Sequence, residues 1–174
     1  MDYAAQLGQH DRGMPAEVPA GQALMEKAMR LGFHRHAEMA WIDDYLAAWN
    51  DHDPAAVTDF MTNDVVYTDF GLGEEFNGIE AVREFVEGME IGFSTDYRFR
   101  LEQAIVTPEA YSYEWTMTGT NDREDAERDF PATGMRFEIP GVSIGVLRNG
   151  KIKDNRDYWN MSTYLMQVGL EREP

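Results

Sequence analysis

An aspartate near the end of a predicted strand is the first candidate for chemistry in this sequence. Residues 151–159 alternate in polarity, so Asn155, Asp157 and Trp159 are expected on one face of a strand. If that face points into the protein, Asp157 is a carboxyl group in apolar surroundings. Burial raises the pKa of a carboxyl, which suits a general acid or base near neutral pH. The alternative is an exposed Asp157 paired with a lysine or arginine.

A second aspartate lies in an earlier predicted strand, at residues 65–70. Tyr67 and Asp69 share one face of this strand and could supply a hydroxyl donor and a second carboxyl. Asp69 also precedes Phe-Gly, a common turn signal, so it could simply cap a turn. Tyr45 recurs at helical spacing with other apolar residues, so it could be a core residue.

Small and aromatic residues on later strands could form a pocket around these groups. Gly141, Ser143 and Gly145 share one face of the strand predicted at 137–147. If this face lines the interior, the pocket is roomy there; otherwise the small residues only relieve curvature. Trp115 or Trp159, together with methionines, would supply adaptable apolar walls.

The elements that must position these residues follow from hydrophobic periodicity. Apolar residues at helical spacing predict a helix at 37–50, and Asp53 followed by Pro54 predicts the start of a second helix. A third helix follows Gly78. Period-two alternation predicts strands at 97–106, 111–120, 137–147 and 151–159, with a hairpin turn at residues 149–150 and a last helix at 161–168.

This order of elements predicts an α+β fold. Helices on one face of a curved antiparallel sheet make a cone-shaped barrel wrapped around the N-terminal helices. We expect an N-terminal arm with a possible short helix over residues 1–36, the cone domain over 37–170 and a tail over 171–174.

Composition excludes several classes of function. The 174 residues carry a formal net charge of −17, which repels nucleic acid and anionic lipid. The absence of cysteine excludes disulfides, thiolate nucleophiles and zinc–sulfur sites. His34 and His36 diverge on a helix and make a poor metal pair. With no phosphate loop, membrane span or signal peptide in the pattern, we expect a cytoplasmic protein without metal or cofactor.

The C-terminal strand resembles a known family. The sequence of residues 150–159 is similar to the last strand of SnoaL-like polyketide cyclases. The similarity continues into the tail of that family at Leu165, Gln167, Val168 and Gly169. Limonene-epoxide hydrolases have a similar Arg-Asp-Tyr-aromatic segment. In both groups the aspartate matching Asp157 is the catalytic acid or base. The resemblance covers about residues 37–169 and implies a cystatin-like, nuclear-transport-factor-two-like fold, in which a homodimer paired through the outer sheet face is common.

Ketosteroid isomerases share this fold and use an aspartate before a Pro-Phe-Gly-like turn as a proton-shuttling base. A tyrosine on their first helix is its oxyanion partner, and Tyr45 and Asp69 fall at the same relative spacing. The second donor of those enzymes, a protonated aspartate, aligns near Gly145. A complete steroid-isomerase oxyanion hole is therefore not expected.

Limonene-epoxide hydrolases use an aspartate–arginine–aspartate relay, with a tyrosine and an asparagine that hold water. Tyr67 fits the tyrosine, Asp69 replaces the asparagine and Asp157 fits one aspartate, whereas the other relay residues fall on Glu114 and Thr116. The relay is therefore broken. Asp69, Glu114 and Asp157 are expected to share one pocket without an arginine, so at least one should be protonated at neutral pH.

We therefore predict an enzyme that performs cofactor-free acid–base chemistry on a small hydrophobic polyketide, terpenoid or steroid-like molecule. Cyclisation, isomerisation and dehydration all suit Asp157 as principal acid/base, Asp69 as second acid/base or anchor, and Tyr45 or Tyr67 as donor. The alternatives are an epoxide hydrolase, with Asp69 or Glu114 activating water, and a non-catalytic ligand-binding module. Substrate contacts are expected from Glu114, Thr116, Trp115, Ser143, Asn155 and Trp159.

Overall fold

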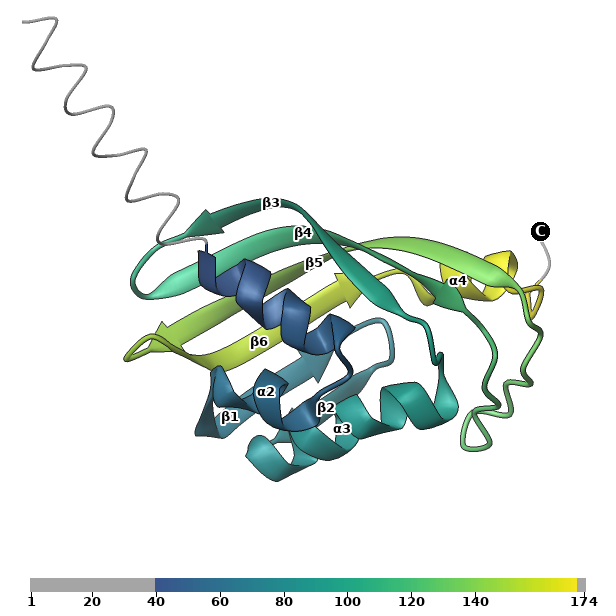
Figure 1. The fold of residues 1–174 in the computed structure, drawn as a ribbon, viewed down its shortest axis with the longest axis horizontal. Helices are drawn as coiled ribbons and strands as arrows, with labels where there is room; N and C mark the ends of the chain where they lie inside the picture. Colours follow the sequence, from purple (N-terminus) through teal and green to yellow (C-terminus); the bar gives the residue numbers. More distant parts are fainter. Residues whose placement is uncertain (1–39, 172–174) are drawn as a thin grey trace, which may run out of the picture. The chain divides into compact units, whose positions relative to one another are not determined.

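Residues 40–171 are the part of the chain that the structure, a computed structural model, describes (Figure 1). The predicted arm, with its short helix and His34 and His36, lies outside this part, as does most of the tail. The first described helix covers residues 40–50. It is followed by α2 (Pro54–Asp59), β1 (Met61–Asp69), β2 (Glu74–Asn77), α3 (Ile79–Gly92), β3 (Arg98–Val106), β4 (Ala110–Thr120), β5 (Arg136–Arg148), β6 (Lys151–Trp159) and α4 (Met161–Gln167).

The six strands form one curved, open sheet in the order β2-β1-β6-β5-β4-β3. The α+β class is confirmed, but the sheet is mixed rather than purely antiparallel, because β1 pairs with β6 in parallel. The sheet also does not close into a barrel, since β2 and β3 are its two edges. The pairing of β1 and β6 joins strands about 90 residues apart, which alternation within each strand could not predict.

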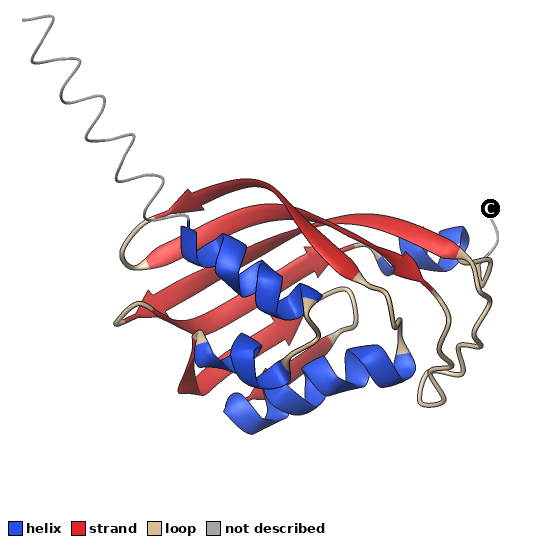
Figure 2. Ribbon diagram, in the orientation of Figure 1, coloured by secondary structure: helices blue, strands red, loops and turns tan. Residues whose placement is uncertain are grey.

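The helices cover one face of this sheet, as Figure 2 shows for residues 40–59 and α3. Ile42, Tyr45, Leu46 and Trp49 are buried at the helical spacing that predicted them, and α3 buries Val82 and Val86. As predicted, Asp53 caps α2: its carboxylate accepts hydrogen bonds from the backbone N–H groups of residues 55 and 56, both at 3.0 Å. These helices bury the inner face of the sheet. No helix within residues 40–171 is long and apolar enough to cross a membrane.

The hairpin between β5 and β6 sets the register of the most polar part of the interior. Asn149 and Gly150 have φ values of 54° and 74°, as a two-residue turn with positive φ at both positions requires. This register places Ser143 opposite Asp157 and Gly145 opposite Asn155. The turn and a β-bulge between Val146 and Leu147, which shifts the pairing by one residue, together align these side chains.

Two glycines of β5 make room for aromatic rings of β4 rather than for a ligand. A Cβ atom at Gly141 would lie 2.3 Å from the Trp115 ring, and one at Gly145 would lie 2.2 Å from the Tyr111 ring. The expectation of a roomy pocket over these glycines is therefore wrong, because neighbouring side chains occupy the space. The glycines instead let Trp115 and Tyr111 pack flat against the strand.

Replacing Gly141 with alanine is expected to lower the free energy of unfolding by about 1–3 kcal/mol, because Trp115 must move. Gly88→Ala is the control: nothing lies within 4 Å of a Cβ at this helical position. It should raise stability by about 0.5–1 kcal/mol, since alanine favours the helix. Urea unfolding of both variants measures the difference. Unchanged stability of Gly141→Ala would contradict this account of the Trp115 packing.

Candidate active site

Asp157 is a buried carboxyl group that accepts hydrogen bonds from three neutral side chains. Its exposed fraction is 8%. Ser143 Oγ donates to its Oδ1 at 2.6 Å and Asn155 Nδ2 donates to the same oxygen at 2.8 Å, while the Tyr67 hydroxyl donates to Oδ2. Within residues 40–171, no arginine or lysine forms an ion pair with Asp157.

A second row of side chains holds these donors in place. Trp115 Nε1 donates to Ser143 Oγ at 2.9 Å, so the serine hydroxyl can direct its own proton to Asp157. Tyr111 donates to Asn155 Oδ1 at 2.6 Å, which fixes the orientation of the amide. Both aromatic residues are those packed against glycines of β5. The carboxyl of Asp157 therefore has a defined position and two inequivalent oxygens.

Burial raises the pKa of Asp157, because the charged carboxylate loses its hydration. The hydrogen bonds from Ser143, Tyr67 and Asn155 act in the opposite direction, since they stabilise the carboxylate. The expectation of a carboxyl in apolar company, rather than one paired with a surface cation, is confirmed in the geometry.

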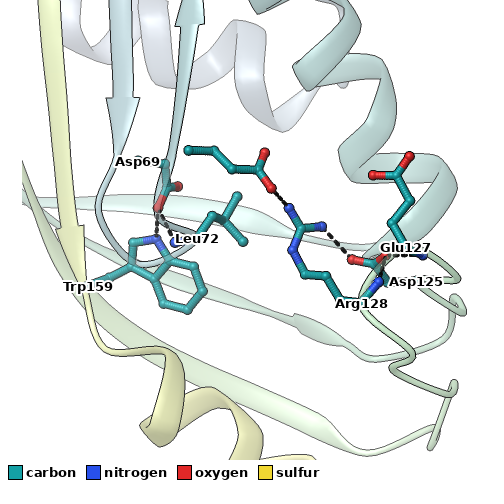
Figure 3. Close-up of polar contacts among 7 residues, drawn as sticks. Asp69, Leu72, Asp125, Glu127, Arg128 and Trp159 are labelled. Carbon is teal, nitrogen blue, oxygen red and sulfur yellow. Dashed lines mark hydrogen bonds and ion pairs between the residues drawn. The ribbon is translucent and has the colours of Figure 1, made fainter.

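Asp69 lies beside Asp157 because β1 and β6 pair in parallel with these two residues in register. Asp69 is also buried, with an exposed fraction of 5%. Trp159 Nε1 and the Leu72 backbone N–H both donate to Asp69 Oδ1, each at 2.8 Å (Figure 3). Trp159 can reach Asp69 since its indole packs on Gly71, where a Cβ would lie 2.1 Å away.

Burial, followed by the neighbouring charge of Asp157, raises the pKa of Asp69 to about 6. Repulsion between two carboxylates is reciprocal, so ionisation of either member disfavours ionisation of the other. The pair is therefore expected to retain one proton in weakly acidic solution.

The two carboxyls lie at the polar end of an apolar cavity. The cavity holds about 400 Å³ of space, counting the part open to solvent. Its walls are held by edge-to-face aromatic contacts, with Trp49 against Phe85 and Phe99 at centroid distances of 6.0 and 5.7 Å. The lining residues are Trp49, Asp69, Leu72, Phe85, Met89, Phe93, Phe99, Trp115, Met117, Asp157 and Trp159.

Comparison with known proteins identifies the family. A profile of the SnoaL-like domain matches residues 42–155, more than half of the chain. The chain belongs to the SnoaL-like family. No curated protein matches the sequence significantly.

Solved structures share the fold of this SnoaL-like protein. A hypothetical protein from Catenulispora acidiphila with a ketosteroid isomerase-like fold, in complex with trimethylamine, is 19% identical with a TM-score of 0.65, covering 76% of this chain and 96% of its own. A proposed polyketide cyclase from Xanthomonas campestris is 24% identical with a TM-score of 0.61 (77% and 98% covered), and one from Pseudomonas putida is 27% identical with a TM-score of 0.58 (73% and 94%). These names concern those proteins, and the likeness shows the fold.

Seven of the residues predicted for the site, the two carboxyls included, lie together around the cavity or around Asp157. Asp69, Asp157, Trp115 and Trp159 line the cavity of this SnoaL-like protein, whereas Ser143 and Asn155 bind Asp157 from the strand side rather than facing a ligand. Tyr67 also reaches Asp157 through its hydroxyl. Alternation along the strands predicted this shared face.

Glu114 and Thr116 do not belong to the cavity. Glu114 is exposed on the opposite face of β4 from Trp115, and Thr116 donates to Glu102 Oε1 at 2.6 Å on that outer face. The expected crowding of three acids is therefore wrong, and only Asp69 and Asp157 are paired. The error came from a position taken from the epoxide-hydrolase resemblance, although strand alternation already placed Glu114 away from Trp115.

Tyr45 is fully buried and does not line the cavity. Its hydroxyl has no hydrogen-bond partner among the described residues. Burial and the charge of Asp157 both raise its pKa, so the hydroxyl stays protonated. The geometry makes Tyr67, which contacts Asp157 directly, the better placed of the two tyrosines predicted as donors.

The cavity walls include residues that the sequence reading missed. Phe85 and Met89 lie on the helix predicted after Gly78, and Leu72 follows the strand predicted at 65–70, but none of the three was predicted for the site. Arg128, from the loop after β4, bonds to Glu74 of β2 and to Asp125 Oδ2, the latter at 2.6 Å (Figure 3). Within residues 40–171, no group of three or more histidines and acids could hold a metal ion.

Asp69→Asn is expected to change how stability depends on pH. The folded pKa of Asp69 lies above the ordinary value of 3.8, so its stabilising effect is complete at low pH and is lost as pH rises from about 4 to about 7. Asparagine has no proton to lose and keeps the acceptor for Trp159. The variant should therefore gain about 3 kcal/mol over the wild type between about pH 4 and pH 8.

Urea unfolding across this pH range measures that gain, with Asp59→Asn as the control for loss of an exposed carboxylate. The control should differ from the wild type by less than about 0.5 kcal/mol throughout. A constant difference between Asp69→Asn and the wild type would show that Asp69 does not titrate in this range.

Glu74→Gln is expected to loosen the loop after β4, because the charge partner of Arg128 on β2 is lost. Backbone amides of residues 123–130 should exchange with deuterium about two- to fivefold faster, as suits a half-exposed ion pair. Glu75→Gln is the matched control, since Glu75 bonds to Asn77 instead. Equal exchange in the two variants would mean that the Arg128–Glu74 pair does not hold the loop.

Proposed function

We propose that this SnoaL-like protein is a cofactor-free acid–base enzyme for a small hydrophobic carbonyl compound, with cyclisation, isomerisation or dehydration as the outcome. The observation that carries the proposal is the pair formed by Asp69 and Asp157, two buried carboxyls with raised pKa values that both line an apolar cavity. Such a pair can hold one proton between its members, which is what combined acid and base catalysis needs.

In the proposed reaction, Asp157 is the base and Asp69 the acid. Asp157 Oδ2 takes a proton from the carbon next to a substrate carbonyl, and the C–H electron pair moves toward the carbonyl carbon. Asp69 Oδ2 gives its proton to the carbonyl oxygen, so the product of this step is a neutral enol. Return of a proton to another carbon isomerises the substrate, loss of water dehydrates it, and attack on a second carbonyl closes a ring.

The residues around Asp69 and Asp157 support these roles of base and acid. Neutral donors hold Asp157 without the cation that would lower its basicity, and the apolar walls keep water from competing for the proton. Tyr67 contributes by keeping one lone pair of Asp157 Oδ2 occupied. This leaves Oδ2 one acceptor site for the substrate proton.

Epoxide hydrolysis is the second candidate, because Tyr67, Asp69 and Asp157 meet around one site, as the epoxide-hydrolase resemblance implies. Asp157 would activate water and Asp69 would protonate the epoxide oxygen. The relay arginine and second aspartate of that resemblance fall on Glu114 and Thr116, which lie outside the cavity, so this candidate ranks second.

Enolisation is testable without knowing the natural substrate. Incubation with hydrophobic ketones in D₂O should give deuterium at the carbon next to the carbonyl, measured by NMR. Asp157→Asn should slow the enzyme-dependent exchange by about 10²–10⁴-fold, as expected for loss of a general base. In the wild type, the rate should fall as pH rises through about 6, because Asp69 loses the proton that it must donate.

Glu114→Gln is the matched control, since it removes a carboxylate from the outer face of β4 and should leave the rate unchanged. Binding of ketones with no exchange by the wild type would overturn catalysis in favour of a ligand-binding module. Turnover of epoxides but not ketones would favour the hydrolase. Equal exchange by the wild type and Asp157→Asn would remove Asp157 from the mechanism.

A further inference from the structure

A second cavity adjoins the candidate active site, and we name it the outer compartment. It shares two wall residues, Leu72 and Phe93, with the cavity that holds the carboxyls. Figure 3 shows Leu72 between Asp69 and Arg128, that is, between the carboxyl end and the outer compartment. The outer compartment holds about 270 Å³, counting its open part, and is lined by Leu72, Gly92, Phe93, Asn121, Asp125, Arg128, Phe130, Met161 and Tyr164.

The polar groups of the outer compartment are already satisfied by one another. Arg128 is paired with both Glu74 and Asp125, so its charge is more than balanced. Asn121 donates to the Tyr164 hydroxyl at 2.7 Å and accepts from the Thr133 backbone N–H at 2.6 Å. An anion would therefore meet excess negative charge, whereas an apolar group would meet Leu72 and aromatic rings. The compartment suits a neutral, apolar occupant.

Unfilled apolar space costs stability, because the lining atoms lose contacts that a packed core would provide. The outer compartment persists beside the carboxyls partly because Gly92, the last residue of α3, has no side chain. A Cβ atom at Gly92 would meet only the backbone oxygen of Glu124, at 4.0 Å. A larger side chain could therefore fill this space without a clash at its first atom.

We propose that the outer compartment is a substrate subsite that binds an apolar chain or second ring of an elongated ketone whose carbonyl lies at Asp69 and Asp157. This inference rests on the proposed function for the carbonyl end. Leu72 and Phe93 are then the residues at which the two parts of the ligand join, and Gly92 sets the length that is accepted.

Two neutral ketones test the subsite: acetophenone and acetophenone carrying a para-hexyl chain. Quenching of tryptophan fluorescence reports their binding, since Trp49, Trp115 and Trp159 line the inner cavity. The wild type should bind the hexyl ketone at least about tenfold more tightly, because several methylene groups leave water.

Gly92→Leu places a side chain in the outer compartment and should abolish the preference for the hexyl ketone. The affinity for acetophenone should stay within about twofold of the wild type, because a larger change would mean that a contact in the inner cavity was lost. Gly88→Leu is the matched control, one helical turn away, where nothing lies within 4 Å of a Cβ; it should keep the preference. Both variants should unfold at or above the wild-type temperature, since leucine replaces glycine in a helix.

Equal affinity of the wild type for the two ketones would overturn the subsite, as would a preference that survives in Gly92→Leu. The readout is binding, so the outcome is separable from catalysis. A protein with the expected preference that exchanges no ketone protons would overturn the proposed function and leave the subsite standing. Proton exchange without a length preference would overturn the subsite alone.

Discussion

The parallel pairing of β1 with β6 is the constraint on which the rest of the site depends. It joins two strands about 90 residues apart and places Asp69 in register with Asp157. Two carboxyls on one face of neighbouring strands repel each other when both are charged, and apolar surroundings strengthen that repulsion. Burial and the neighbouring charge of Asp157 accordingly raise the pKa of Asp69 to about 6.

Neutral hydrogen bonds, rather than counter-charges, hold this pair. Ser143, Asn155 and Tyr67 fix the position of Asp157, and although their hydrogen bonds act to lower its pKa, the effect of burial is larger and the pKa is raised. The glycines of β5 contribute indirectly, since they admit the Trp115 and Tyr111 rings that orient the serine and the asparagine. The position of the Asp157 carboxyl on β6 therefore depends on aromatic rings of β4 that pack over glycines of β5.

The two cavities differ in how their charged side chains are paired. At the inner end two acids lack a cation, whereas at the outer end Arg128 is held between two acids. The inner end can therefore exchange a proton, and the outer end can only close a surface. Leu72 and Phe93 belong to the walls of both cavities.

The sequence by itself determined the strand faces, the hairpin at residues 149–150 and the cap at Asp53, because these follow from local periodicity and turn chemistry. Family resemblance, rather than periodicity, favoured Asp69, Tyr67 and Asp157 as site residues. Tertiary structure alone decided that β1 lies parallel to β6, that Trp115 and Tyr111 fill the space over Gly141 and Gly145, and that Arg128 reaches Glu74. Each of these depends on which distant segments pack together. Local patterns fix the face on which a side chain lies, but only the packed fold fixes its neighbours.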